Sequence, residues 1–165
     1  MGAILILGVD PGLQRCGWGI VASEGLRLSH VAHGVVKPDV KLSLAERLAL
    51  VIAGLEEVIL AYKPHEASVE ETFVNSNARA ALALGQARGV TLAACARANL
   101  PVAEYAPATI KKALVGAGGA DKTQVAFMVR RLLPTAGEMT ADSADALAAA
   151  LCHAAHAGMR RRTGS

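Results

Sequence analysis

The stretch Ala3-Ile4-Leu5-Ile6-Leu7-Gly8-Val9-Asp10-Pro11-Gly12 decides the fold of this chain. Residues 3–9 are almost wholly apolar, which is typical of a strand buried on both faces of a sheet. Asp10 follows directly, and Pro11 and Gly12 then favour a turn. Open α/β sheets place their ligands at the carboxyl ends of such strands. The sequence therefore predicts a strand over residues 3–9 whose end can carry a functional carboxylate.

Periodic patterns outward from this strand predict the rest of the fold. We expect further strands at 16–22, 30–36, 66–71 and 101–105, and helices at 43–62, 78–98, 108–115, from a cap at Asp121 to just before Pro134, and at 141–157. Strands in succession, followed by alternating strands and helices, indicate an α/β fold with one mixed five-stranded sheet flanked by helices. We assign residues 1–158 to a single domain and expect 159–165 to form a basic, flexible tail.

Composition excludes several other classes of protein. The chain has 165 residues, of which 53% are apolar and 19% charged, which supplies a core and argues against global disorder. Its apolar runs are far shorter than the roughly 18 residues that span a bilayer, so no membrane association is expected. Cys16, Cys95 and Cys152 are widely spaced, which predicts a reduced, cytoplasmic protein. The net charge of +3 tolerates a polyanionic partner without requiring one.

Four acidic residues from three distant segments are candidates for one site. Asp10 and Glu70 belong to predicted strands, while Asp142 and Asp145 open the last predicted helix three residues apart, so that both can face the same way. Carboxylates that share a site repel one another unless cations neutralise them, and hard divalent cations prefer oxygen ligands. Two such ions about 4 Å apart can promote phosphodiester cleavage.

Each of these acids also has an ordinary structural interpretation. Asp10 precedes Pro11 and Gly12 and fits a simple turn. Asp142 and Asp145 fit the acidic first turn that a helix dipole favours, and Glu70 fits a solvated strand end. Only the combination of all four acids favours a catalytic site.

Three other features are compatible with a phosphate-bearing partner. The loop Gly116-Ala117-Gly118-Gly119 precedes Lys122 and lets backbone amides approach a phosphate, although a plain helix connection explains it too. It departs from a nucleotide phosphate loop at Asp121, and the preceding segment is predicted to be helical. Lys111 is a candidate for phosphate contact, and Phe73 fits either the core or stacking on an unpaired base. For His153 and His156, surface or core positions are favoured over a metal site.

Five segments, in order and with suitable spacing, resemble the RuvC family of bacterial Holliday-junction resolvases. They are Gly8-Val9-Asp10-Pro11-Gly12, Val69-Glu70-Glu71-Thr72-Phe73, Leu84-Gly85-Gln86-Ala87-Arg88-Gly89, the glycine loop from Val115 to Lys122, and Asp142-Ser143-Ala144-Asp145-Ala146-Leu147. The resemblance covers nearly the whole chain.

This resemblance implies an RNase H-like fold and an endonuclease of DNA recombination and repair. The implied activity is resolution of four-way DNA junctions by paired symmetric nicks, through hydrolysis that depends on two Mg²⁺ ions per site, with Mn²⁺ able to substitute. The resemblance also implies a homodimer that works with the branch-migration proteins RuvA and RuvB.

The resemblance assigns roles to individual residues. Asp10, Glu70, Asp142 and Asp145 take the places of the catalytic, metal-binding acids, and Phe73, Lys111 and Lys122 take those of DNA-binding residues. Some relatives carry His at the position of Asp142, so its role is the least defined. Neighbouring residues of a strand face opposite ways, so we expect Glu71 to point away from Glu70 and to be non-catalytic.

Three other functions fit parts of the sequence. An actin-like nucleotide binder also begins with a strand, Asp and Gly, but it needs a second lobe that 165 residues cannot supply. A non-catalytic DNA-binding module would tolerate loss of the acids. A related RNase H-like nuclease that acts on RNA is the nearest alternative.

Overall fold

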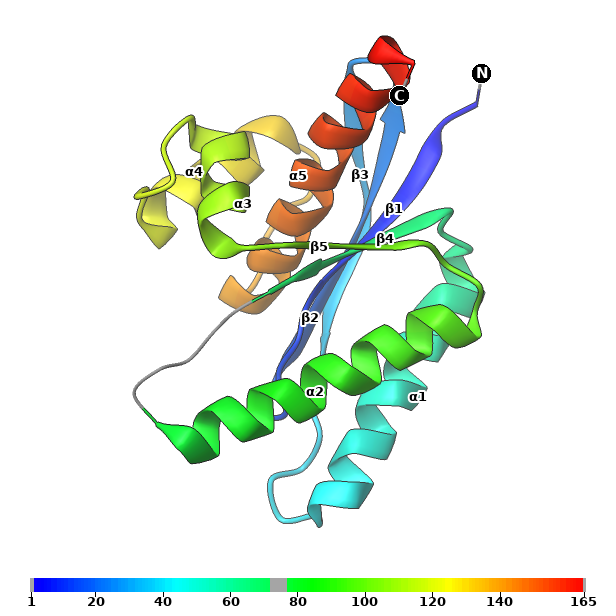
Figure 1. Ribbon diagram of the computed structural model, residues 1–165, viewed down its shortest axis with the longest axis vertical. Coiled ribbons are helices and arrows are strands. Elements are labelled where there is room, and N and C mark those ends of the chain that lie inside the picture. Colours follow the sequence, from blue (N-terminus) through cyan, green and yellow to red (C-terminus); the bar gives the residue numbers. More distant parts are fainter. Residues whose placement is uncertain (1, 72–76, 165) are drawn as a thin grey trace.

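The computed structural model describes residues 2–71 and 77–164, which form a sheet with helices on both faces (Figure 1). The elements, in chain order, are β1 (Ile4–Asp10), β2 (Cys16–Glu24), β3 (Arg27–Val36), α1 (Leu44–Tyr62), β4 (Glu66–Glu70), α2 (Ala78–Arg97), β5 (Val102–Tyr105), α3 (Pro107–Val115), α4 (Lys122–Leu132) and α5 (Ala141–Thr163). None of the described helices has the length and apolar character needed to cross a membrane.

The sheet is mixed and five-stranded, as predicted. Its strand order is β3-β2-β1-β4-β5, so β1 is central. β1, β2 and β3 form an antiparallel meander, whereas β4 pairs with β1 and β5 pairs with β4 in parallel. Val9 is level with Val69 in the β1–β4 ladder, so the residues after them, Asp10 and Glu70, end these two strands at the same edge of the sheet.

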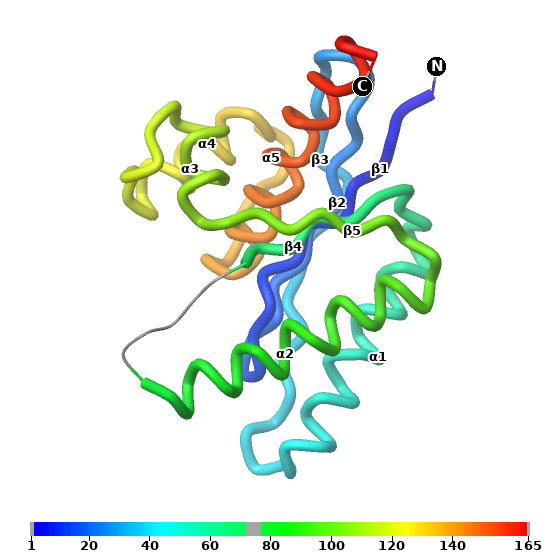
Figure 2. Tube along the Cα trace, in the orientation of Figure 1, coloured from blue at the N-terminus to red at the C-terminus, as the bar shows by residue number. Residues whose placement is uncertain are grey.

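Two apolar layers cover the two faces of the sheet. On one face Ile6 and Val21 pack with Leu147 of α5 and with residues of α3 and α4. On the other face Leu7 and Val9 pack with Leu55 of α1 and residues of α2. Figure 2 shows the two groups of helices on opposite sides of the sheet. The alternation of Ile6 and Leu7 between the layers follows from the period of a strand and explains why β1 is apolar throughout.

Glycines let α5 lie unusually close to the sheet. A Cβ atom on Gly8 would stand 1.9 Å from the carbonyl oxygen of Ala146, and one on Gly17 would stand 2.1 Å from that of Asp142. Such separations are impossible for a real side chain, so the helix backbone occupies the space that larger residues would fill. This close approach places the first turn of α5 beside the end of β1.

The last helix is longer than its apolar pattern predicts. α5 continues through Arg160, Arg161 and Arg162 to Thr163, where Gly164 ends it in a left-handed conformation. The predicted end of this helix at residue 157 is therefore wrong, while the flexibility of the chain end stays a prediction. Cations in the last turn of a helix interact favourably with its dipole, so these arginines are compatible with a helix although they continue no apolar stripe.

Candidate active site

The four predicted acids line one pocket of about 340 Å³. Asp10 and Glu70 reach it from the ends of β1 and β4, and Asp142 and Asp145 reach it from the first turns of α5. Lys111 of α3 and Lys122 of α4 line the same pocket. The structure thus brings together six of the seven residues that the sequence singled out; the seventh, Phe73, lies outside the described residues.

The start of α5 is fixed by a cap. The hydroxyl oxygen of Thr140 accepts a hydrogen bond from the backbone N–H of Ser143 at 3.1 Å. Ser143 itself is buried and its hydroxyl donates back to the carbonyl oxygen of Thr140. These bonds begin the helix just before Asp142 and Asp145, which therefore share one face.

The pocket concentrates negative charge in a buried place. Burial, followed by the nearby carboxylates of Glu70, Asp145 and Asp142, raises the pKa of Asp10 from its usual range to about 8, and Asp10 shares a hydrogen bond with Glu70. Burial also raises the pKa of Asp145, against the opposing effect of Lys122. Carboxylates under such mutual repulsion are a natural site for a divalent cation.

Basic side chains partly neutralise the acids. The Nζ atom of Lys122 lies 3.6 Å from Oδ2 of Asp145. On the other side, Nη1 of Arg15 lies 3.9 Å from Oδ2 of Asp142. Sequence reasoning did not identify Arg15, because nothing in its local pattern shows that the turn after β1 reaches the start of α5.

The donor set fits divalent metal ions. All four acids present oxygen ligands, and burial together with the neighbouring carboxylates raises the pKa of Asp10, so a cation among them would be favoured. Within residues 2–71 and 77–164, no three His, Cys, Asp or Glu side chains are already arranged to hold an ion. Holding ions in this pocket would therefore involve a change in the side-chain conformations of the acids.

The raised pKa of Asp10 predicts that the stability of the metal-free protein depends on pH. In the folded chain Asp10 keeps its proton up to about pH 8, whereas in the unfolded chain it ionises near 3.8. The stability that protonated Asp10 contributes is therefore fully present below its unfolded pKa of 3.8. It is lost as the pH rises through its folded pKa of about 8. We expect Asp10→Asn to stabilise the metal-free protein by on the order of 2 kcal/mol at about pH 8, with little effect at about pH 4.

Thermal unfolding in EDTA across this pH range measures the effect. Added Mg²⁺ should reduce the difference, because the cation relieves the same repulsion in the parent protein. A lower melting temperature for Asp10→Asn than for the parent at about pH 8 would contradict the assigned electrostatics.

Glu71 faces away from the pocket, as expected. Its carboxylate lies 3.7 Å from the Arg88 guanidinium of α2. Arg88 also donates a short hydrogen bond to Glu104. Glu71 is therefore held on the α2 side of the sheet while its neighbour Glu70 lines the acid pocket.

The glycine loop connects two helices. Gly116 ends α3 in a left-handed conformation, and Asp121 caps α4 in the predicted capping box with Gln124. Because a helix and not a strand precedes the loop, the nucleotide phosphate-loop interpretation fails. The loop's structural role is to bring Lys122 to the pocket.

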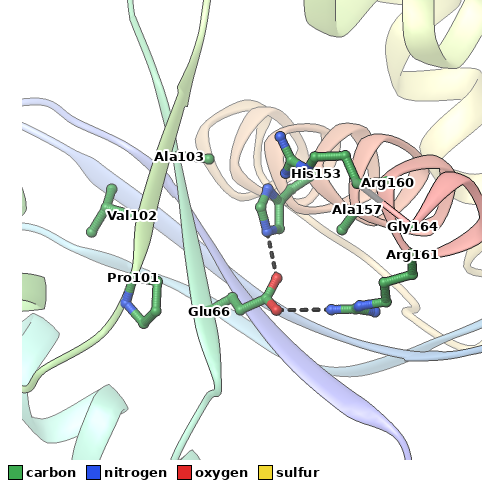
Figure 3. A pocket seen from close by; sticks show the side chains of 9 residues that line it. All are labelled: Glu66, Pro101, Val102, Ala103, His153, Ala157, Arg160, Arg161 and Gly164. Carbon is green, nitrogen blue, oxygen red and sulfur yellow. Dashed lines mark hydrogen bonds and ion pairs between the residues drawn. The ribbon is translucent and has the colours of Figure 1, made fainter.

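His153 is a core histidine, as favoured from the sequence. One ring nitrogen lies 2.9 Å from the Tyr105 hydroxyl. The other lies 2.6 Å from a carboxylate oxygen of Glu66, which also accepts a hydrogen bond from Arg161 (Figure 3). Glu66 begins β4 whereas Glu70 ends it, so this network lies at the opposite edge of the sheet from the acids. It explains why the basic end of α5 is helical.

The fold and the site together define the class of protein. A central strand and its parallel neighbour each end in an acid, and the last helix crosses them closely and adds two more. This is an RNase H-like protein. The chain of Thermus thermophilus RuvC solved with a Holliday-junction substrate superposes with a TM-score of 0.87 at 36% identity, covering 94% of this chain and 96% of that one. The yeast mitochondrial Holliday-junction resolvase Ydc2, with a TM-score of 0.66 at 12% identity, shares the fold.

Sequence comparison gives the family. The model of the family described as crossover junction endodeoxyribonuclease RuvC matches residues 6–153. The crossover junction endodeoxyribonuclease RuvC of Hyphomonas neptunium is 54% identical over 162 residues, which cover 98% of this chain and 97% of the relative. That of Caulobacter sp. strain K31 is 58% identical over 151 residues, covering 92% and 89%. The chain belongs to the RuvC family of crossover junction endodeoxyribonucleases.

Proposed function

We propose that this protein resolves Holliday junctions in DNA recombination and repair, by paired symmetric nicks that depend on divalent metal ions. The observation that carries the proposal is the single pocket formed by Asp10, Glu70, Asp142 and Asp145 with Lys111 and Lys122. Membership of the RuvC family supports the choice of substrate.

The four acids would hold two Mg²⁺ ions, for which Mn²⁺ can substitute. When bound, such ions lower the pKa of water and stabilise the leaving oxygen of a phosphodiester. The charges of Glu70, Asp142 and Asp145 all act on Asp10, so we propose that Asp10 would help to hold both ions. Glu70 and the two acids of α5 would supply the other protein ligands.

The basic residues would act on the DNA. Water attacks the scissile phosphorus in line, the bond to the 3′ oxygen breaks, and the products are a 5′-phosphate and a 3′-hydroxyl. Lys122, released from Asp145, would stabilise the negative charge that develops on the phosphate oxygens. Lys111 would contact the phosphate from α3, and Phe73 stays a prediction for stacking at the junction centre.

Substrate choice tests the proposal. We expect cleavage of a synthetic four-way junction in Mg²⁺, little cleavage of linear duplex DNA or an RNA–DNA hybrid of the same sequence, and none in EDTA. Preferred cleavage of the hybrid would instead support the RNase H-like nuclease acting on RNA. Binding of the junction without cleavage in either Mg²⁺ or Mn²⁺ would support a non-catalytic DNA-binding module.

A symmetric junction calls for two sites, and we propose a homodimer. Supporting it, Gly85 and Gly89 of α2 have open space where a Cβ would lie, whereas Ala87, Thr91 and Ala94 of the same helix are buried in the monomer. Sedimentation equilibrium at micromolar concentration should give twice the 17.0 kDa chain mass. A single species at the chain mass would contradict the dimer.

Two further proposals rest on the family and on the cysteines. RuvA and RuvB are proposed partners because the resemblance to the RuvC family implies them. A cytoplasmic location agrees with Cys16, Cys95 and Cys152, which are all free and buried.

A further inference from the structure

A second groove opens directly beside the acid pocket. It has a volume of about 480 Å³ and is lined by the turn after β1, by α1 and by α2. Asp10, Leu84 and Asp142 line both cavities, so the groove continues the acid pocket along the surface. Its additional polar side chains are Gln14, Arg15 and Arg47.

The guanidinium of Arg47 has few hydrogen-bond acceptors in this groove. It donates one hydrogen bond, from Nη2 to the carbonyl oxygen of Leu13 at 3.1 Å. Its Nε atom is buried and, within residues 2–71 and 77–164, has no hydrogen-bond partner. Among the residues that the structure describes, no carboxylate lies within ion-pair distance of Arg47. The Nε atom is closed to solvent, so a ligand would contact Arg47 through the part of its side chain that lines the groove. A charged group with so few acceptors gains from a further one.

The position of Arg47 on its helix adds to this cost. Arg47 lies in the N-terminal part of α1, which begins at Leu44 after the cap at Ser43. The positive end of the helix dipole disfavours a cation there and favours an anion. Glu46, the acid of the same turn, is used in the capping box with Ser43. An anion bound in the groove would satisfy the guanidinium and offset the unfavourable position of its charge near the positive end of the helix.

Arg15 supplies a second cation that can move. Its side chain is 59% exposed and its pair with Asp142 is long, at 3.9 Å. If Asp142 turns to a metal ion, as proposed above, the Arg15 guanidinium is released beside the groove. The groove then offers two cations to its ligand while the acid pocket becomes neutralised.

We propose that this groove binds the backbone phosphate next to the scissile one on the cleaved DNA strand, with Arg47 as the main contact and Arg15 as the second. The inference rests on the proposed function, because the strand that leaves the acid pocket is the ligand whose charge and position fit. Arg47 is therefore a substrate-binding residue as well as a support for the turn that contains Leu13.

Salt dependence of binding tests the charge contact. In EDTA, fluorescence anisotropy with a labelled junction gives the slope of log Kd against log salt, to which each phosphate contact contributes about 0.9. Arg47→Gln should reduce that slope by about this amount for each bound subunit. Arg97→Gln is the matched control, because Arg97 lies at the far end of α2, is exposed and pairs with Glu56. It should leave the slope almost unchanged.

Replacing single phosphates by uncharged methylphosphonates locates the phosphate that Arg47 contacts. The replacements are made one at a time at positions flanking the cleavage site. One position should weaken binding by the parent protein roughly tenfold, as expected for a lost charge-assisted contact, and should have almost no effect on Arg47→Gln. Arg47→Lys, which keeps the charge, should retain most of the salt slope.

Two results would overturn the inference. One is a parent protein that is insensitive to methylphosphonates beside the scissile phosphate; this scan stays decisive even if Arg47→Gln does not fold. The other is an Arg47→Gln variant with a lower melting temperature but unchanged salt slope and methylphosphonate sensitivity, which would show that Arg47 only supports the turn. Junction cleavage by the parent in Mg²⁺ is measured in parallel, and its absence would refute the proposed function without deciding the binding test.

Discussion

Glu70→Gln is expected to lower the rate of junction cleavage by roughly a thousandfold or more, because it removes a charge that stabilises the transition state through bound cations. Glu70 ends β4 level with Asp10 and lines the acid pocket. Junction binding should stay the same or become tighter, since one negative charge beside the phosphate is lost. Single-turnover cleavage and anisotropy on the same sample separate the two effects.

The neighbouring residue provides the control. Glu71→Gln removes the same charge one position further along, but its side chain faces Arg88 on the other side of the sheet. Because it interacts through a partly exposed ion pair, its loss should change the cleavage rate by no more than about threefold. Equal losses for Glu70→Gln and Glu71→Gln would refute the assignment of Glu70 to the site.

The largest effect on stability is expected from Gly8→Ala. The new Cβ would stand 1.9 Å from the carbonyl oxygen of Ala146 and 2.9 Å from the backbone nitrogen of Ala150. Backbone atoms of α5 cannot rotate away, so the whole helix must shift. We expect a loss of about 3 kcal/mol or more in the free energy of unfolding, and a fall in melting temperature of roughly 6–12 °C.

Gly158→Ala on α5 is the matched control. A Cβ at Gly158 meets nothing within 4 Å, and an alanine in a helix is favoured by up to about 1 kcal/mol over glycine. Gly158→Ala should therefore be neutral or stabilising, while Gly8→Ala also loses cleavage activity because Asp142 and Asp145 move with α5. A Gly8→Ala protein as stable as its parent would show that α5 does not lie against β1 as described.

The sequence predicted those parts of the fold that depend on local periodicity. β1 was evident because it is apolar throughout and ends at Asp10-Pro11-Gly12, and α4 because its capping box precedes an amphipathic stripe. The β2–β3 hairpin extends further than predicted, with β3 beginning at Arg27, because strand pairing includes polar residues near a turn. The end of α5 was misplaced because Arg161 is stabilised by Glu66, which is 95 residues away along the chain.

Some features of the candidate site could be predicted from the sequence, and others could not. The convergence of the acids was predictable from their types, their positions at strand and helix ends, and the family resemblance. The ion pair of Arg15 with Asp142 was not, and neither was the Nε of Arg47, which has no hydrogen-bond partner among the described residues. Both depend on how the turn after β1 packs against α1 and α5. Such contacts between distant segments leave no periodic signal in the sequence.

Anomalous diffraction from Mn²⁺-soaked crystals of the protein with a four-way junction tests whether the four acids hold metal ions. We expect two manganese peaks per subunit in the acid pocket, with Asp10 contacting both, Glu70 contacting one, and Asp142 or Asp145 contacting the other. An acid pocket without manganese in crystals that contain the bound junction would refute the proposed metal site.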